Sequence, residues 1–552
     1  MNSAIRHFPI LLLSFLLFGV NTKAQEPQPV AVAATDSSAL SKRTYIYLLH
    51  ADVTKFDKRR DPDATILVGD VVFRRDSMYM YCDSAFLYRQ QNSFKAYGNV
   101  RMEQGDTLFL YGDFLDYNGD TNLARVRNNV RLEDCTSVLE TDSLDFDRNI
   151  NLGYYFAGGT LFDEQSTLDS YWGEYNVNTK NAVFTDAVVL QNPQFVLESD
   201  TLHYNTNTNV ATIVGPTNIN SGANHIYSEL GYYDTNTRQA TLLNRSVVSN
   251  DNKELTADSL FYDAIAAYSE AYGHIVYADT ISKNMLTGDY GYFNEMVDSA
   301  FVTDRAVVMD FSQGDTLYMH ADTIWAVSHN LNTDSLYRQV RAFHHVRAFR
   351  SDIQAVCDSL VFDSRDTCMT MYKDPILWNN GQQLLGEEIK VYMDTASIDW
   401  VHVINQTLYV DKLDSVNYNQ IRGKEMIFLF KDKRLDEMQV LGNVEVVYFA
   451  MDEDSLYMGM NTTTSGKLNA YMKDGEMNKI VVPTESTGVF YPMSLIPADK
   501  HYLGNFAWFD YVRPISKQDI FLWRGKSRDM QLKKVERSNV PLPTLDRFKE
   551  KE

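Results

Sequence analysis

The stretch Gly105–Leu132, with the sequence GDTLFLYGDFLDYNGDTNLARVRNNVRL, decides the fold class. It contains two runs of alternating apolar residues, separated by a turn rich in Asn, Gly and Asp. An alternation with a period of two predicts β-strands, and this turn composition predicts a hairpin between them. The apolar positions change parity at Gly112-Asp113, and the return run is interrupted at Asn128-Asn129. We therefore expect a β-hairpin whose two arms both bend near the middle.

The same pattern recurs along the chain, with further copies beginning at Asn192, Asn252 and Gly314. The acidic residue at the bend, or the residue in its place, recurs in five consecutive steps of 29 residues from Asp113 to Asp258. A fixed period of this size predicts stacked units and not independent domains. We expect an all-β fold: an elongated, solenoid-like β-jellyroll of bent antiparallel hairpins, shaped like a taco, with an apolar trough inside.

The repeated Asp argues against catalysis. A catalytic residue is needed once, whereas a corner residue is needed in every repeat, so we expect the Asp side chain to bond backbone N–H groups at the bend. The sequence has no GxSxG, HExxH or phosphate-loop pattern, and His344 and His345 are adjacent, so they would point to opposite faces of a strand. We expect no enzyme activity, no catalytic residue, no metal and no cofactor.

Charge and cysteine content narrow the partners. The net charge of -22 argues against a nucleic-acid partner. The four cysteines form no CxxC or Cys/His pattern, which argues against zinc. Cys82 and Cys357 occupy the same place in two repeats and are expected to be small buried residues, while a Cys357–Cys368 disulfide across one hairpin stays open.

The two ends of the chain differ from the repeats. A short positive segment precedes the apolar run Pro9–Val20, and Thr22-Lys23-Ala24 offers a small-residue cleavage site. This pattern is typical of a secretory signal peptide, with a retained membrane anchor as the alternative. The basic C-terminal tail, residues 524–552, either docks a partner or is a solvated end. The expected organisation is a signal peptide (1–24), a linker (25–44), the repeats (45–482), a capping region for the last open strand (483–523) and a basic flexible tail (524–552).

The repeated unit resembles a known family. Ala257–Asp263 (ADSLFYD) and Ala96–Val100 (AYGNV) are similar to the OstA-like repeat, and the similarity covers roughly Tyr45 to Tyr457. That repeat builds the LptA-like periplasmic bridge protein of lipopolysaccharide transport and the N-terminal domain of its outer-membrane partner. We expect more repeats than in the bridge protein and no long C-terminal barrel, because the repeats run almost to the end of the sequence.

The resemblance implies a function for the trough. It implies a carrier or bridge, located in the periplasm with association to the outer membrane left open, that shields the acyl chains of lipopolysaccharide or another acylated lipid. It also implies that inner- and outer-membrane transport components join it by edge-strand pairing. By position, the lipid-binding groove would be lined by Leu108, Leu110, Leu115, Val130, Leu132, Leu197, Leu202, Leu255 and Leu260.

Other functions remain open from the residues alone. A hairpin near 29 residues also suits an outer-membrane β-barrel, and a closed, self-filled core would suit a structural solenoid or adhesin without lipid cargo. A glycan-active enzyme on a β-helix scaffold would centre on the unusual unit Tyr171-Trp172-Gly173-Glu174, with Glu174 as its carboxylate.

Overall fold

The computed structural model describes residues 44–525 except 58, 164, 313, 395–396, 433, 453, 474–475 and 484. The expected signal peptide, nearly all of the expected linker and all but the first two residues of the expected tail lie outside the described residues.

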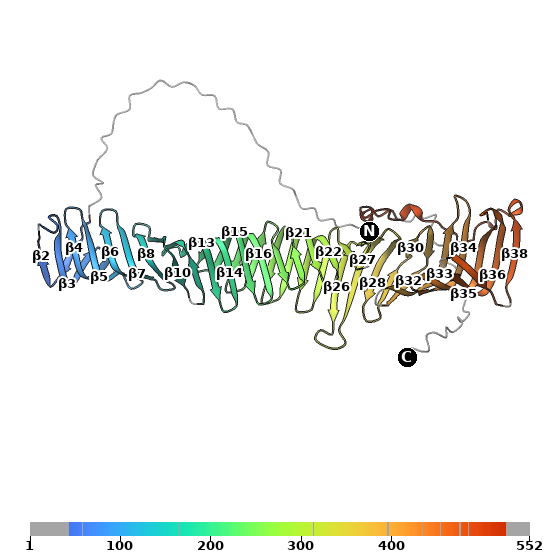
Figure 1. Cartoon of the computed structure of the whole chain (residues 1–552), viewed down its shortest axis with the longest axis horizontal. Helices are drawn as coiled ribbons and strands as arrows, with labels where there is room; N and C mark the ends of the chain where they lie inside the picture. Colours follow the sequence, from blue (N-terminus) through green and yellow to red (C-terminus); the bar gives the residue numbers. More distant parts are fainter. Residues whose placement is uncertain are drawn as a thin grey trace, which may run out of the picture. The chain divides into compact units, whose positions relative to one another are not determined.

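The described chain consists of β-strands and three short 3-10 turns (Figure 1). The strands that precede residue 260 are β1 (Tyr47–His50), β2 (Val53–Lys55), β3 (Thr65–Arg75), β4 (Met78–Tyr88), β5 (Ser93–Gln104), β6 (Leu108–Asn118), β7 (Leu123–Glu133), β8 (Val138–Asp147), β9 (Leu152–Tyr155), β10 (Gly159–Phe162), β11 (Thr167–Ser170), β12 (Trp172–Asn176), β13 (Asn181–Asn192), β14 (Phe195–Asn205), β15 (Val210–Ser221), β16 (Asn224–Asp234), β17 (Gln239–Leu243), β18 (Val247–Asn250) and β19 (Lys253–Thr256). The later elements are β20 (Ser259–Asp263), β21 (Tyr268–Asp279), β22 (Asn284–Asn294), β23 (Ser299–Thr303), β24 (Val307–Asp310), β25 (Leu317–His320), β26 (Thr323–His329), β27 (Tyr337–Phe349), β28 (Ile353–Asp363), β29 (Cys368–Tyr372), β30 (Ile376–Asn379), β31 (Gln382–Leu385), β32 (Glu388–Asp394), β33 (Ser397–Lys412), β34 (Tyr418–Lys431), β35 (Arg434–Met451), β36 (Tyr457–Lys473), β37 (Glu476–Val481), β38 (Thr487–Pro492), η1 (Met493–Leu495), η2 (Asp510–Val512) and η3 (Asp519–Phe521).

All these strands belong to one antiparallel sheet in which each hairpin pairs with the next. The bends appear as breaks in register: β5 and β6 pair through Tyr97↔Phe114 and then through Val100↔Gly112. The residues between these pairs have backbone angles that ordinary strands do not adopt, with φ of 76° at Gly98 and 43° at Asn99. The expectation of an elongated all-β fold made of bent antiparallel hairpins is confirmed.

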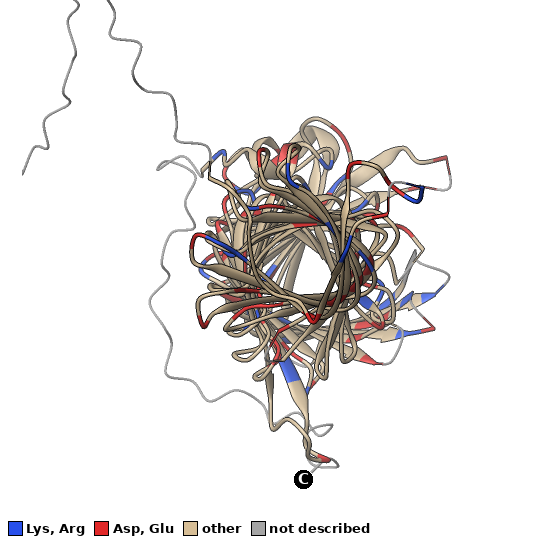
Figure 2. Ribbon diagram, turned by 90° about the vertical axis from the view of Figure 1, so that its left-hand side faces the viewer, with Lys and Arg blue, Asp and Glu red and all other residues tan. Residues whose placement is uncertain are grey.

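Each bend divides the sheet into two walls. We call the half that contains Leu108–Tyr111 the first wall and the half that contains Phe114–Asn118 the second wall, and we call the line of bends the corner ridge. The hairpin turns of the two walls face each other on the side opposite the ridge, which we call the mouth. Viewed end-on, the two walls enclose the interior, and charged residues gather at the turns around the outside (Figure 2).

One apolar cluster fills the interior from Leu67 to Ala470. A second cluster lies on the outer face of the first wall, where Trp378, Leu408 and Val410 pack against Phe509 of the C-terminal segment. This segment, residues 493–525, is here called the strap. After β38 pairs with β36, the strap therefore returns along the outer face of the first wall.

None of the four cysteines is in a disulfide. Cys82, Cys357 and Cys368 are buried, and Cys135 is exposed. Cys368 pairs with Asp363 across its hairpin, so the structure does not form the Cys357–Cys368 disulfide that the sequence left open.

Candidate functional site

The residues predicted to line a groove all lie in the interior cluster. Each is at most 5% exposed, and Leu197, Leu202 and Leu260 are fully buried. Solvent therefore barely reaches this part of the inner face, because side chains from the two walls fill the space between them. The structure brings together Leu108, Leu110, Leu115, Val130, Leu132, Leu197, Leu202, Leu255 and Leu260.

Polar contacts also close the mouth over the same part of the chain. Each joins a hairpin turn of the first wall to a turn or strand end of the second wall, and we call them the rim contacts. They are Arg75 Nη1 to Gly119 O, Arg148 Nε to Gln104 Oε1 (3.4 Å), Tyr175 Oη and Lys180 Nζ to Asp134 Oδ2 (2.5 and 2.8 Å), Tyr204 Oη to Asp163 Oδ2 (2.6 Å), Arg238 Nη2 to Ser221 Oγ (3.3 Å), Asn224 Nδ2 to Tyr262 Oη (2.7 Å) and Lys253 Nζ to Asp298 Oδ1 (3.2 Å).

Asp134 is a buried acid of the rim, with a side chain only 2% exposed. Burial alone would raise the pKa of Asp134, but hydrogen bonds from Lys180 and Tyr175 outweigh burial and lower it. The same carboxylate raises the pKa of Tyr175, although burial is the larger cause of that rise. Asp134 is therefore ionised near neutral pH, and the rim contact that it forms is charge-assisted.

The inner face differs beyond residue 300. Many of its apolar side chains there are only partly buried. The contacts Tyr457 Oη to Asp414 Oδ2 (2.6 Å) and Asn419 Nδ2 to Asp411 Oδ2 (3.4 Å) stay within the first wall. The interior is therefore closed over its N-terminal part. Over its C-terminal part, buried lining residues such as Met371 and Val403 alternate with half-exposed ones. The partly buried residues are Leu317, Val340, Met369, Leu377, Leu384, Met393, Phe430, Leu435 and Tyr448.

Sequence reasoning missed this half-exposed inner face. Its residues follow the same alternation as those of the closed part, so periodicity cannot separate the two. The available signal was the step between corner acids, which becomes irregular after Asp258. The rim contacts were also missed, because most of their partners lie 38 to 46 residues apart and in different repeats.

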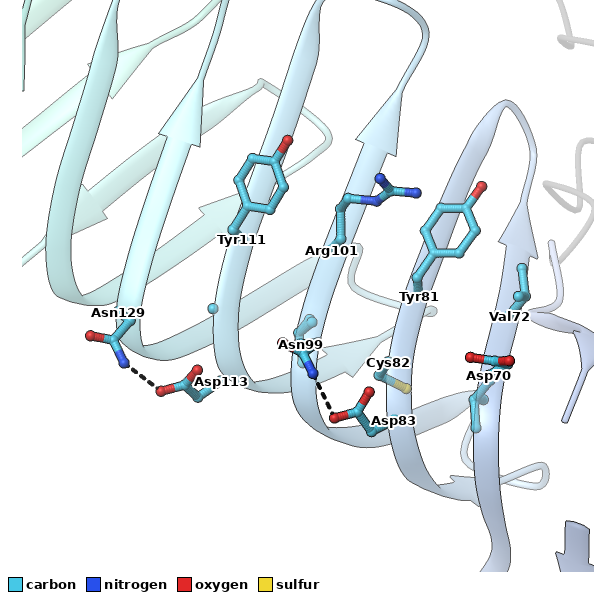
Figure 3. A pocket seen from close by; sticks show the side chains of 13 residues that line it. Asp70, Val72, Tyr81, Cys82, Asp83, Asn99, Arg101, Tyr111, Asp113 and Asn129 are labelled. Atoms are coloured by element: carbon cyan, nitrogen blue, oxygen red, sulfur yellow. Dashed lines mark hydrogen bonds between the residues drawn. The ribbon is translucent and has the colours of Figure 1, made fainter. Parts of the chain in front are cut away.

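The corner ridge carries the repeated acids. Asn129 Nδ2 donates to Asp113 (2.6 Å), and Asn99 Nδ2 donates to Asp83 (2.8 Å) (Figure 3). At the bend that contains Asp258, His274 Nδ1 takes the place of the asparagine and lies 2.6 Å from Asp258 Oδ2. The Asp side chains thus serve the bend, as expected, but their partners here are side chains of the neighbouring strand and not the backbone N–H groups that we expected.

An outward-facing pocket of about 650 Å³ lies along this ridge between β3 and β7. Figure 3 shows Tyr81, Arg101 and Tyr111 on successive strands above the acids. The Arg101 guanidinium lies 4.5 Å from the centre of the Tyr81 ring and 3.1 Å from Glu103. The pocket is polar and lies outside the interior, so it has no part in an apolar groove.

His344 and His345 belong to the same ridge. His344 Nδ1 lies 3.4 Å from Asp358, and His345 Nδ1 lies 2.7 Å from Asp322 on the other side. Both have positive φ, because the bend bulges at this point. Each histidine therefore contacts the acid of a different bend: His344 contacts Asp358, and His345 contacts Asp322.

The strap is held by two glutamines of the first wall that are fully buried. Gln383 Nε2 donates to Ala507 O (2.9 Å), and Gln383 Oε1 accepts from Phe509 N (2.7 Å). Gln420 repeats this arrangement with His501 O (3.1 Å) and Leu503 N (2.9 Å). Each amide thus gives the strap the donor and the acceptor that a neighbouring strand would give.

Metal ligands do not cluster in the described part of the chain. Within the described residues, no group of three or more His, Cys, Asp or Glu side chains could hold a metal ion. Glu174 lies on β12, between Tyr154 and Val183 of the neighbouring strands. No helix in the described part of the chain is long and apolar enough to cross a membrane.

Comparison with known proteins identifies the repeats. Residues 43–200 and 196–310 match the family model of OstA-like protein. A stretch of 70 residues is 39% identical to the LPS-assembly protein LptD of Pseudomonas fluorescens. That stretch is 13% of this chain and 7% of LptD, so the match spans a small fraction of that relative's length.

Proposed function

Because residues 43–310 belong to the OstA-like protein family, we propose that the protein acts in lipopolysaccharide transport as a carrier whose apolar inner face shields acyl chains. The observation that carries the proposal is the half-exposed inner face between Leu317 and Tyr448. Each methylene moved from water onto such a surface stabilises the complex by about 0.8 kcal/mol. Lipid acyl chains, with many methylenes, are the ligands that gain most from this surface.

The closed part of the interior is not open to lipid as it stands. Its lining, including Leu110 and Leu202, can contact lipid only after the rim contacts break and the walls separate. A second function therefore fits residues 65–300: a filled, rigid spacer between the two ends of the sheet. The two functions differ in one outcome, which is whether lipid reaches the closed lining.

The two ends of the sheet suit partners that add a strand. β1 exposes Tyr47 and Leu49, which are 53% and 51% exposed, and β38 exposes Val489 and Phe490, at 43% and 52%. Edge strands with exposed apolar side chains are templates for pairing with another chain. We propose that components of the inner and outer membranes pair there, with the chain placed in the periplasm or at the outer membrane.

A binding experiment with two adjacent substitutions tests the carrier function. Val340 packs against the interior cluster, and Arg341, next to it on β27, contacts Gln339 and Trp325 on the outer side. Displacement of a fluorescent fatty acid by purified lipopolysaccharide measures the affinity of each variant. Val340→Asp should weaken binding at least tenfold, which is about 1.4 kcal/mol, and Arg341→Gln should leave it unchanged. Equal affinities for the two variants, or no binding by the unsubstituted protein, would reject the carrier function.

A further inference from the structure

A second cavity, of about 260 Å³, lies outside the interior. It lies where the end of the strap meets the first wall and the corner ridge. Arg347 of β27 forms one side, Asp358 and Lys373 of the ridge form another, and Trp523 and Arg524 of the strap form the third. The cavity thus brings three cationic side chains together from three separate elements.

Arg347 is buried, and two of its nitrogens have no hydrogen-bond partner within the described part of the chain. It is only 3% exposed, and its Nε and Nη1 atoms have no hydrogen-bond acceptor among the described residues. Its guanidinium lies 5.5 Å from the centre of the Trp523 ring. Burial lowers the pKa of Arg347 to about 10, although Asp322 and Asp519 oppose this shift from a distance. A buried guanidinium still carries its charge at this pKa, and such a charge is costly unless an acceptor meets it.

We propose that this cavity binds a phosphate group, which accepts hydrogen bonds from the Arg347 guanidinium through Nε and the adjacent Nη2. The Nε–H group and the adjacent Nη2–H group form one edge of the guanidinium fork, which matches two oxygens of an oxyanion. A planar carboxylate would place both of its oxygens on this edge and would have none left for the other cations. A tetrahedral phosphate has further oxygens that can face Lys373 and Arg524 on the other sides of the cavity.

The neighbouring charges limit the ligand to one phosphate group. Lys373 Nζ donates to Asp358 (2.8 Å), and Arg524 Nη1 donates to Asp519 (2.9 Å), so both cations are partly neutralised. An ammonium has three N–H donors, and Lys373 can therefore serve Asp358 and the phosphate together. Asp374 also borders the cavity and would repel a second phosphate. Arg347 therefore supplies the positive charge for the phosphate, because its Nε and Nη1 atoms have no carboxylate partner among the described residues.

The phosphate could be free or could belong to a phosphorylated lipid headgroup, since both present the same oxygens. The site does not depend on the carrier function, because the cavity lies on the outer face of the first wall. Loss of phosphate binding and loss of acyl-chain binding are therefore separate results.

Thermal unfolding of the full-length protein in inorganic phosphate tests the site, with chloride at equal ionic strength as the reference. The midpoint of the unsubstituted protein should rise with phosphate concentration and then level off. Arg347→Met should weaken the apparent affinity at least tenfold, and in chloride it should be at least as stable as the unsubstituted protein. Arg341→Met, on the same strand and outside the cavity, should behave like the unsubstituted protein.

Lys373→Met gives a second variant, because this side chain is 71% exposed and its replacement leaves the core intact. It should weaken phosphate binding three- to tenfold. Dihexanoyl phosphatidic acid and dihexanoylglycerol identify the source: tighter binding of the phosphatidic acid than of inorganic phosphate indicates a lipid headgroup, and equal binding indicates free phosphate. A phosphate effect no larger than that of chloride, or one that Arg347→Met retains, would overturn the proposal.

Discussion

At three bends of the sheet, a glycine with positive φ lies against the acid of the preceding strand. Gly98 has a φ of 76°, and a Cβ atom placed there would lie 2.5 Å from Asp83 Oδ2. Gly69 and Gly273 meet Asp52 and Asp258 in the same way. At these three bends, glycine supplies both a backbone with positive φ and room for the carboxylate, whereas Asn128 and Asn129 adopt positive φ beside Asp113.

Replacing Gly98 by alanine should destabilise the protein by about 1–3 kcal/mol. The left-handed backbone costs a residue with a Cβ atom roughly 1–2 kcal/mol, and the contact with Asp83 adds to that cost. Gly105→Ala is the matched control, because Gly105 has a φ of 64° and a Cβ atom placed there would meet nothing within 4 Å. The urea midpoint should fall further for Gly98→Ala than for Gly105→Ala, and equal falls would show that the acid imposes no steric limit.

Asp134 should make the stability of the closed part depend on pH. Its pKa is lower in the folded protein than in the unfolded chain, so its ionisation stabilises the fold above the unfolded value of about 3.9. This contribution is lost as the pH falls through the lower, folded pKa. Asp134→Asn should lower the free energy of unfolding by about 1–3 kcal/mol at neutral pH, and its difference from the unsubstituted protein should shrink in acid.

Urea midpoints measured between pH 7 and pH 3 check this prediction. Asp106 is the control, because it occupies the preceding turn of the first wall and is exposed. Asp106→Asn should leave the pH profile unchanged. A constant difference between Asp134→Asn and the unsubstituted protein down to pH 3 would contradict the assigned role of the carboxylate.

At the scale of elements, the strap depends on two side chains of the first wall. Gln383 and Gln420 each exchange two hydrogen bonds with the strap backbone. Removing either amide leaves buried backbone groups without partners, which costs about 1–3 kcal/mol for each group. Gln383→Ala and Gln420→Ala should therefore loosen the strap while the strands stay paired.

Limited proteolysis measures this loosening directly. Cleavage within residues 493–525 should be faster in both variants, with the strands as resistant as before. Gln382→Ala is the control, because Gln382 is exposed and adjacent to Gln383. Unchanged cleavage of the strap in the two variants would mean that apolar packing around Phe509 holds it alone.

Strands and bends could be predicted from the sequence because both are local. The alternation around Leu110 and the break at Asn128-Asn129 define a bent hairpin without reference to any other repeat. The strap could not be predicted in this way. Its partners Gln383 and Ala507 are 124 residues apart, and the outer face that it covers differs from other repeats only in residues such as Trp378.

At the scale of the whole sheet, the repeats are alike in sequence pattern but not in accessibility. The lining near Leu110 and Leu202 is buried behind rim contacts, whereas the lining near Leu384 and Phe430 is half exposed. The interior position of the nine predicted residues followed from alternation, since period two assigns each residue to a face. Accessibility could not follow from alternation, because it depends on how closely the two walls approach across the mouth.

Photo-crosslinking to lipopolysaccharide along the inner face is the most direct test of where the lipid binds. A photoreactive side chain is placed in turn at Leu110, Leu202, Leu384 and Phe430, and at the outward-facing Arg341 as the reference. We expect crosslinks at Leu384 and Phe430 at least tenfold above those at the other three positions, because lipid reaches only the half-exposed lining. Equal crosslinking at all five positions, or the strongest crosslink at Arg341, would contradict a carrier with a half-exposed inner face.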